Sequence, residues 1–337
     1  MTALRRAVVT GATGLLGSNL VRHLLADNTE VVAIVRDRAR AERLLPDSIG
    51  LQVVRGDITR PETIAPALRG ADAIFHTAAY FREYYGPRAD LGLLHRTNVT
   101  AVINLLGAAV AAGVPVIVHT SSAGVLGPAR HGQAADESTP LPADQGRNRY
   151  FASKARAEQE VGAFARRHGL RVPIVLPGWM WGPGDAGPTS SGALFLRIAQ
   201  GRQAAVPATG NYVVDARDVA AACVRAAAGR SDRYVVAGVR HSLPAICAQI
   251  AETVGTRPPR PLPGWAARSL VTVPELTDRL RRRPPASTRR GVRALIEADR
   301  RRISSARAED ELGVTFRPLR ETFAAEAEWY RHHALLP

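Results

Sequence analysis

Short apolar runs alternate along the chain with longer segments that carry apolar residues at helical spacing. The runs predict strands at Ala7–Thr10, Glu30–Val35, Leu51–Val54, Ala73–His76, Pro115–Thr120 and Arg171–Leu176. The longer segments predict helices, of which the clearest are Leu15–Ala26, Asn98–Ala112 and Arg149–His168. Strands that are apolar on both faces and separated by helices are typical of a parallel sheet covered on both sides. The predicted fold class is therefore α/β, with a doubly wound parallel sheet.

The pattern changes after Pro177, where residues 177–205 are rich in Gly, Pro and Trp. The alternation then returns with a strand at Tyr212–Val214, a helix after Asp218 and a strand at Tyr234–Ala237; from His241 onward the pattern is mostly helical. We therefore expect residues 1–176 and 206–239 to form one large domain. Residues 177–205 and 240–337 are expected to form a smaller, mostly helical C-terminal region.

Composition excludes several classes of protein. Of the 337 residues, 46% are hydrophobic and 22% are charged, as in globular rather than disordered proteins. Cys223 and Cys247 cannot form a disulfide framework, and no Cys/His cluster has metal spacing, so we expect no metal and a reducing, cytoplasmic compartment. The uncharged stretch Thr97–Ala129 is long enough to span a bilayer. Because Gly113 and Pro115 interrupt it, we expect no membrane span.

The formal net charge of +15 is unevenly distributed. The segment Leu276–Arg302 holds ten arginines against three acidic residues. Such a segment could bind nucleic acid or an anionic membrane surface, or it could be a solvated helical surface. No aromatic residue lies among these arginines to stack on bases, so we favour the solvated surface and do not expect nucleic acid as a partner.

A glycine-rich loop lies directly between the first predicted strand and the first predicted helix. Its candidate contacts to a bound dinucleotide are Gly11, Thr13, Gly14, Leu15, Leu16 and Gly17. Glycines allow the backbone to turn tightly and approach a pyrophosphate, and the helix N-terminus supplies free N–H groups. The large domain is therefore expected to be an NAD(P)-binding Rossmann domain.

The end of the second strand bears on which dinucleotide is bound. Arg36 would meet the 2′-phosphate of NADP, and Arg38 is near, whereas Asp37 would suit the ribose hydroxyls of NAD. We expect NADP (as NADPH), with NAD possible. Asp57 and Ile58 follow the third strand and would lie beside the adenine.

Tyr150 and Lys154 open the long predicted helix four residues apart, so both side chains lie on one helical face. A cation beside a phenol stabilises the phenolate, which makes the tyrosine usable as a proton donor or acceptor. Lys154 is the only lysine in a chain with 44 arginines, which makes a chance pairing a poor explanation. Ser122 follows the fifth strand and could polarise a carbonyl oxygen.

The glycine loop, Ser122, Tyr150 and Lys154 together resemble the short-chain dehydrogenase/reductase superfamily. The spacing and length are similar to its extended subfamily, the NAD-dependent epimerase/dehydratase family, and most to dihydroflavonol-reductase-like proteins. The resemblance also includes the segments Phe75–Ala79, Pro177–Pro183, Val214–Ala220 and Ser304–Gly313.

This resemblance assigns roles to individual residues. Tyr150 would be the catalytic acid/base, Lys154 its partner and a cofactor contact, and Ser122 the residue that orients the carbonyl, with Ser121 as the alternative by one register. Asn98 would hold a relay water or the helix geometry. The remaining cofactor contacts would be Thr77, Ala78, Ala79 and Pro177.

Aromatic residues gather where a substrate would lie. They are Tyr80, Phe81, Tyr84, Tyr85, Trp179 and Trp181, of which Tyr80, Tyr84, Trp179 and Trp181 are the candidate substrate contacts. Loops after the strands rim the pocket of such a fold, so an apolar or aromatic carbonyl substrate is expected, and the smaller region would bind it. Alternatively, these residues pack the two parts of the chain together. Trp179 and Ala123 depart from the pattern of sugar-nucleotide dehydratases.

Three functions are compatible with these residues. The leading one is an NADP-dependent oxidoreductase, a ketone or aldehyde reductase or an alcohol dehydrogenase, acting on a small molecule. The alternative is a sugar epimerase, dehydratase or isomerase that retains its NAD(P). The third is a non-catalytic sensor or RNA-binding protein, against which Ser122, Tyr150 and Lys154 argue. By analogy with the superfamily, the helices Asn98–Ala112 and Arg149–His168 would form the interface of a homodimer.

Overall fold

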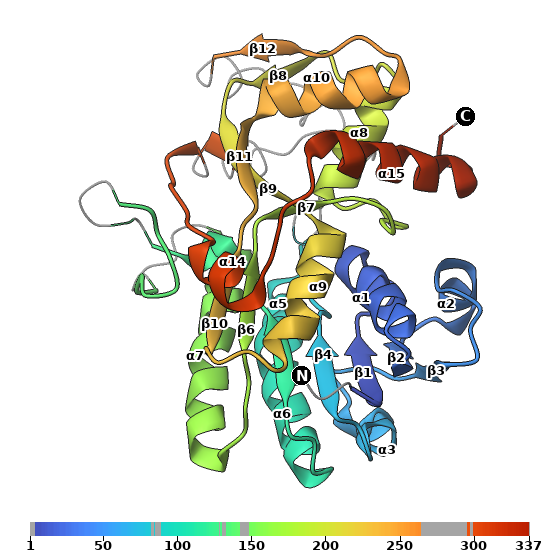
Figure 1. Cartoon of the computed structure of the whole chain (residues 1–337), viewed down its shortest axis with the longest axis vertical. Coiled ribbons are helices and arrows are strands. Elements are labelled where there is room, and N and C mark those ends of the chain that lie inside the picture. The colour runs from blue at the N-terminus through green and yellow to red at the C-terminus, as the bar shows by residue number, and fades with distance from the viewer. Residues whose placement is uncertain are drawn as a thin grey trace.

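The structure is a computed structural model that describes residues 4–81, 84, 89–127, 129, 133–141, 148–263, 295–296 and 299–336. Most of the arginine-rich segment Leu276–Arg302, and Tyr85, lie outside the described residues. The chain forms a Rossmann-type α/β lobe around a parallel sheet, drawn in the lower half of Figure 1, and a second lobe in the upper half.

Seven parallel strands form the central sheet in the order β10-β6-β5-β4-β1-β2-β3. Their bounds are β1 Arg6–Thr10, β2 Glu30–Val35, β3 Leu51–Arg55, β4 Ala73–His76, β5 Ile117–Thr120, β6 Ile174–Pro177 and β10 Arg233–Val236. The order reverses beside β1, and in such sheets a ligand binds at the carboxyl ends of the strands next to that point. The doubly wound parallel sheet expected from the sequence is confirmed.

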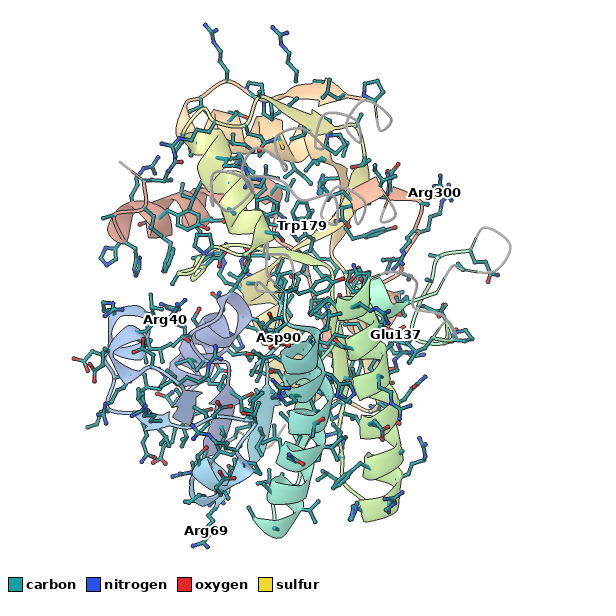
Figure 2. All side chains as sticks on the ribbon, turned by 180° about the vertical axis from the view of Figure 1, so that it is seen from behind. Arg40, Arg69, Asp90, Glu137, Trp179 and Arg300 are labelled. Carbon is teal, nitrogen blue, oxygen red and sulfur yellow. The ribbon has the colours of Figure 1, made fainter. Side chains whose placement is uncertain are left out.

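Helices cover both faces of this sheet. One face packs against α1 Leu15–Ala26, α2 Arg38–Leu44, α9 Ala216–Ala226 and α14 Ala306–Leu312. The other face packs against α3 Ala65–Leu68, α6 Ala101–Ala111 and α7 Arg149–His168, and α6 and α7 lie side by side in the view from behind (Figure 2). The shorter helical segments are η1 Pro61–Thr63, α5 Leu91–His95, the π-helical η2 Arg96–Thr100 and η3 Ala123–Val125.

Among the described residues, the second lobe contains two small sheets and the helices α8, α10 and α15 around their own apolar core. A three-stranded sheet has the order β11-β9-β7, and β12 pairs with β8. The bounds are β7 Trp179–Trp181, α8 Ser190–Ala199, β8 Ala205–Pro207, β9 Gly210–Asp215, β11 Val239–Ser242, α10 Leu243–Val254, β12 Arg260–Leu262 and α15 Leu319–His332.

Several sequence predictions need correction at this level. The sequence pattern assigns the strand Tyr212–Val214 to the large domain, but β9 pairs with β7 and β11 and does not join the seven-stranded sheet. Among the described residues after His241, the helices α10, α14 and α15 are accompanied by the end of β11 and all of β12. Helix α9 begins before Asp218, at Ala216, because the Asp215 side chain caps it.

Glu326 of α15 is a carboxyl group enclosed in the second lobe, with 1% of its surface exposed. One of its oxygens, Oε2, accepts a hydrogen bond from the Gly182 N–H at 3.0 Å. Burial raises the pKa of Glu326 well above its usual value, and the charge of Asp185 raises it further, while the hydrogen bond from Gly182 opposes both. The carboxyl is therefore favoured in its neutral form in the folded chain.

We expect Glu326→Gln to raise the melting temperature at about pH 8 by roughly 2–4 °C, the shift that ~1 kcal/mol causes in chains of moderate size. The unfolded chain loses this proton above the ordinary pKa, so native stability falls as pH rises from that value toward the raised pKa. The amide has no proton to lose, so the gain should shrink toward about pH 5. Thermal melts of both chains at the two pH values test this; an equal difference at both would exclude the Glu326 carboxyl as the cause.

Candidate functional site

The glycine loop between β1 and α1 lies against the end of β4. Gly11 has a φ of +71°, and a Cβ there would come within 2.7 Å of the Ala78 backbone nitrogen. A Cβ at Gly17 would overlap the Gly11 carbonyl oxygen. The Thr77 hydroxyl donates to the carbonyl of Thr10 at 2.8 Å and fixes the two strand ends together. Only glycine therefore fits positions 11 and 17.

Gly14 is exposed at the N-terminus of α1, which no side chain caps. An added Cβ at Gly14 would meet only the Gly11 carbonyl oxygen, at 3.2 Å, so the outer side of the loop is open. The side chains of Leu15 and Leu16 are buried, which leaves their backbone N–H groups as what they can offer a ligand. This open cradle of backbone at a helix N-terminus fits the pyrophosphate of a dinucleotide.

The three candidate residues after β2 are Arg36, Asp37 and Arg38, and each has different contacts. Asp37 caps α2, where its Oδ1 accepts from the Arg40 N–H at 3.0 Å. Arg38 pairs with Glu42 at 3.1 Å, and Arg36 is exposed beyond β2. Burial raises the pKa of Asp57, but hydrogen bonds from Thr59 and the charges of Arg36 and Arg60 outweigh it, and the net shift is downward. Arg36 and Asp57 thus lie near enough to interact.

Tyr150 and Lys154 occupy the first two turns of α7. The Asn148 side chain caps this helix by accepting from the N–H groups of Tyr150 and Phe151 at 3.1 and 3.3 Å. Lys154 is 2% exposed, and its Nζ donates to the carbonyl oxygen of Thr120 at 2.8 Å. Burial lowers the pKa of Lys154 to about 8, while Glu158 acts to raise it. The sheet end at β5 therefore fixes the position of the ammonium group.

An aromatic cluster surrounds the Tyr150 ring. The ring centroids of Phe81, Phe151 and Tyr84 lie 5.0, 5.5 and 6.3 Å from that of Tyr150. Tyr80 belongs to the same buried group. The hydroxyls of Tyr80 and Tyr84 accept from the N–H groups of Asp90 and Arg149, respectively. The structure thus brings Tyr80 and Tyr84 to Tyr150, in packing positions with their polar ends engaged.

The two serines after β5 have different surroundings. Ser121 is 3% exposed, and its hydroxyl donates to Glu158. Ser122 is half-buried, and its Oγ accepts from the Gly124 N–H at 3.2 Å as the cap of η3. A Cβ at Gly124 would overlap the Phe151 ring, so this turn lies against the start of α7. Of the two serines, Ser122 is therefore the more exposed residue.

Asn98 lies in the π-helical turn η2 and connects it to α7. Its Oδ1 accepts from the Tyr80 N–H at 2.7 Å, and its Nδ2 donates to the Ser153 Oγ at 3.0 Å. The Ser153 hydroxyl in turn donates to the carbonyl of Tyr150 at 2.7 Å. These contacts favour the second of the two roles expected for Asn98, which is to hold the helix geometry.

Comparison with known proteins identifies the family of this chain. Residues 7–237 match the model of the NAD dependent epimerase/dehydratase family. A protein of Synechocystis sp. named dihydroflavonol 4-reductase is 32% identical over 332 residues, covering 96% of this chain and 94% of its own. The chain belongs to the NAD-dependent epimerase/dehydratase family.

Two further proteins are similar over nearly their whole length. Sterol demethylase protein B of Methylococcus capsulatus is 34% identical over 337 residues, covering 98% of this chain and 99% of its own. The crystal structure of gox2253 has a TM-score of 0.81 and 31% identity, and covers 98% of this chain and 99% of its own. This epimerase/dehydratase-family chain is thus an extended short-chain dehydrogenase/reductase, an enzyme that depends on a nicotinamide cofactor.

The two candidate tryptophans of this family member are not equivalent. Trp181 is fully buried in the core of the second lobe, with its ring 5.4 Å from that of Phe323, which corrects its expected role as a substrate contact. Trp179 is half-buried and lies where the second lobe meets the sheet (Figure 2). Pro177 ends β6 at the same edge of the sheet. Trp179 is therefore the more exposed of the two candidate tryptophans.

Two histidines lie in the sheet near Lys154. His76 and His119 stack with ring centroids 5.4 Å apart, and the Thr10 hydroxyl is 2.7 Å from the Nδ1 of His76. Burial, and next the charge of Lys154, lower the pKa of His76 to about 3 and that of His119 well below its usual value. Both rings are therefore neutral. Within the described part of the chain, no group of three or more His, Cys, Asp or Glu residues could hold a metal ion.

No helix among the described residues has both the length and the apolar character needed to cross a membrane.

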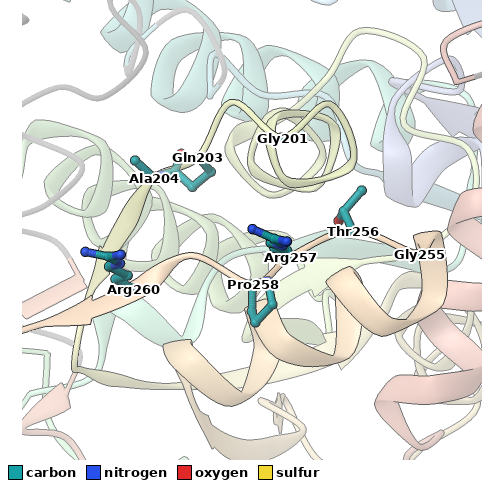
Figure 3. A pocket seen from close by; sticks show the side chains of 8 residues that line it. All are labelled: Gly201, Gln203, Ala204, Gly255, Thr256, Arg257, Pro258 and Arg260. Carbon is teal, nitrogen blue, oxygen red and sulfur yellow. The ribbon is translucent and has the colours of Figure 1, made fainter.

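A separate hollow of about 570 Å³ lies in the second lobe, where α8 and α10 end (Figure 3). Its lining residues are Gly201, Gln203, Ala204, Gly255, Thr256, Arg257, Pro258 and Arg260. Helix C-termini carry partial negative charge, which the two arginines complement. The hollow contains none of the predicted site residues.

Proposed function

We propose that the chain is an NADP-dependent oxidoreductase that interconverts a carbonyl compound and an alcohol with Ser122, Tyr150 and Lys154. The observation that carries the proposal is the placement of a buried ammonium group one helical turn from Tyr150, anchored on the strand that leads to Ser122. Bound NADPH supplies the hydride. Tyr150 exchanges a proton with the substrate oxygen, Lys154 stabilises the phenolate, and Ser122 donates a hydrogen bond to that oxygen.

An apolar or aromatic substrate fits the surroundings of Tyr150. The ring is enclosed by Tyr80, Phe81, Tyr84 and Phe151, and the half-buried Trp179 lies where the second lobe meets the sheet. Such walls recognise a substrate mainly by burying its apolar surface. The similar protein of Synechocystis sp. carries the name of a reductase, which supports reduction as the direction.

A cofactor-coupled substrate screen tests the proposal. The purified chain is mixed with NADPH and either aromatic ketones or nucleotide sugars, and NADPH consumption is followed by absorbance. Consumption that depends on a ketone supports the oxidoreductase. Conversion of a nucleotide sugar without net NADPH consumption, by protein that retains its cofactor through purification, would instead identify an epimerase or dehydratase.

The choice of NADP depends on Arg36. We expect Arg36→Ala to weaken NADPH binding by about 10–100-fold and to leave NADH binding nearly unchanged, because a charged hydrogen bond contributes ~1.5–3 kcal/mol. Arg43→Ala is the matched control, since Arg43 is exposed on the neighbouring helix α2. Fluorescence titration with both dinucleotides measures the effect. Equal loss for NADPH and NADH, or tight NADH binding alone in the native chain, would exclude the 2′-phosphate as the partner of Arg36.

A further inference from the structure

A buried carboxylate lies one helical turn beyond Lys154. Glu158 is 6% exposed, and its Oε1 accepts the Ser121 hydroxyl hydrogen bond. Its Oε2 forms an ion pair with Arg233 Nη2 at 3.0 Å. Tyr150, Lys154 and Glu158 therefore form a stripe at intervals of four residues along α7. Both oxygens of Glu158 have partners other than Lys154, so its position does not depend on the lysine.

The charged and titratable groups around Lys154 come from four elements. His76 on β4 and His119 on β5 are neutral, because burial and the charge of Lys154 lower the pKa of each. Arg233 on β10 is the cation paired with Glu158, and Tyr150 lies on α7 itself. Glu158 is the group that raises the pKa of Lys154 against the lowering by burial. Burial in turn raises the pKa of Glu158 above its usual value, and Arg233, Ser121 and Lys154 offset only part of this rise.

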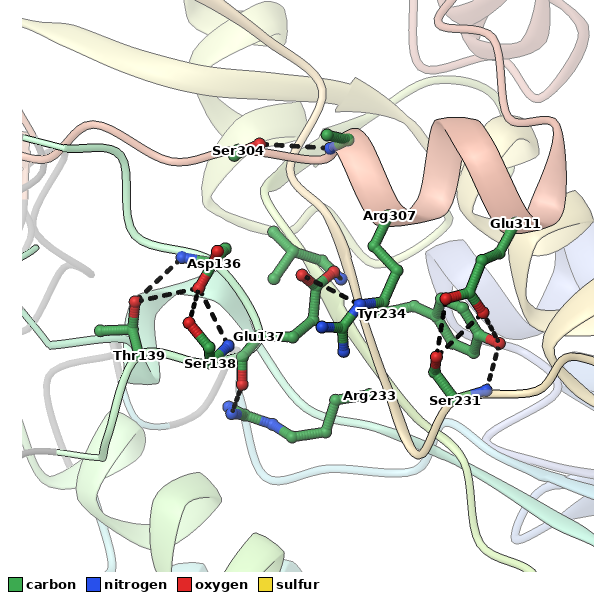
Figure 4. A network of polar contacts seen from close by, with 12 residues as sticks. Asp136, Glu137, Ser138, Thr139, Ser231, Arg233, Tyr234, Ser304, Arg307 and Glu311 are labelled. Carbon is green, nitrogen blue, oxygen red and sulfur yellow. Dashed lines mark hydrogen bonds and ion pairs between the residues drawn. The ribbon is translucent and has the colours of Figure 1, made fainter.

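A segment outside the sheet, at Glu137, contacts the Arg233 guanidinium and fixes its position. Its Nη1 donates to the carbonyl of Glu137 at 2.8 Å (Figure 4). The Glu137 side chain is buried, where it accepts from the Val235 N–H at 2.7 Å and lies 3.7 Å from Arg307. Since Arg233 and Val235 belong to the edge strand β10, these contacts fix the guanidinium that faces Glu158. The carboxylate is therefore fixed on one side by β5 and on the other by β10.

We propose that Glu158, held by Ser121 and Arg233, is a positioning residue that keeps the Lys154 side chain charged and anchored on Thr120. An ammonium group in a site this enclosed would lose its proton without a fixed carboxylate nearby. The role of Lys154 toward Tyr150 rests on the proposed function. The charge of Lys154 does not, because it can be measured without cofactor or substrate.

The single lysine makes this charge directly observable. Protein grown with lysine labelled with ¹⁵N at Nζ gives one side-chain amine signal, from Lys154. In the unsubstituted chain we expect its NMR titration to give a pKa of about 8. Buried lysines without compensation titrate at about 5–6. A value in that range for the unsubstituted chain would overturn the proposal, and this measurement needs no variant to fold.

Glu158→Gln removes the charge with little change of shape. We expect the Lys154 midpoint to fall by at least about one pH unit, the lower end of the shifts that an opposite charge causes. The double variant E158Q/R233Q avoids leaving a partly buried guanidinium unpaired, and it should show the same direction of change. Glu160→Gln is the matched control, because Glu160 pairs with Arg156 on the exposed side of the same helix. An unchanged midpoint in either folded Glu158 variant would overturn the proposal.

A kinetic measurement separates this role from a merely structural one. Where the oxidoreductase activity holds, kcat/KM of Glu158→Gln should decline at alkaline pH about one unit earlier than in the native chain or Glu160→Gln, matching the NMR shift. A uniform loss of activity with no shift of the profile would contradict it. If no oxidoreductase activity is found at all, the NMR titration still decides the role of Glu158.

Discussion

Tyr150→Phe is expected to lower kcat/KM by about 10²–10⁴-fold, the contribution typical of a well-placed general acid or base. The substitution removes one hydroxyl and keeps the ring that packs against Phe81, Phe151 and Tyr84. Folding and NADPH binding should therefore be nearly unchanged. Steady-state kinetics across the pH range, combined with a fluorescence titration of NADPH, measure both parts of this expectation.

Tyr234→Phe is the matched control for loss of a buried tyrosine hydroxyl. The Tyr234 hydroxyl accepts from the Ser231 N–H at 2.8 Å and donates to Glu311 at 3.0 Å, on β10 near α14 (Figure 4). Its removal should cost about 1 kcal/mol of stability and leave kcat/KM of the folded chain unchanged. Activity of Tyr150→Phe within about threefold of the native value would remove Tyr150 from the chemistry.

The sequence predicts best those elements whose ends carry local signals. The bounds predicted for α1 and α7 agree with the structure. For α7 the reason is visible, because Asn148 caps its start and Gly169, at a φ of +63°, ends it. Strand β5 begins later than predicted, at Ile117, and β6 begins at Ile174. Pro115 and Pro173 lack the N–H groups that would continue these ladders.

Elements that depend on distant partners are harder to predict. Strand β11 is largely exposed and shows no apolar alternation, so only its pairing with β9 makes it a strand. Trp181 looks like a pocket residue next to Trp179, and both lie on the same face of β7 with ring centroids 4.8 Å apart, but the core of the second lobe buries Trp181 completely. Tertiary packing, which no local pattern reports, decides both cases.

The same distinction applies within the candidate site. Tyr150, Lys154 and Glu158 share one helical face, a relation that the spacing shows, although the carboxylate could equally have been a solvated one. Arg233 is 79 residues from Lys154 and is one of 44 arginines, so no local signal separates it from the others. Local patterns reveal neither Glu158 as the buried acid next to Lys154 nor Arg233 as the ion-pair partner of Glu158, since both roles follow from burial and from the pairing of β10 with β6.

Lys154→Arg is expected to lower kcat/KM by about 10²–10³-fold, as much as Lys154→Met, although arginine keeps the charge. The Lys154 side chain lies in an enclosed site and its single nitrogen reaches the Thr120 carbonyl. A planar guanidinium is broader, and its larger volume would have to displace the surrounding packing of α7 and β5.

Kinetics, NADPH titration and thermal melts of both the Lys154→Arg and the Lys154→Met variant separate an effect on chemistry from an effect on folding. If Lys154→Arg kept more than about a tenth of the native activity, charge alone would be sufficient at this position. The expected failure of arginine gives a physical reason why a chain with 44 arginines has its single lysine here.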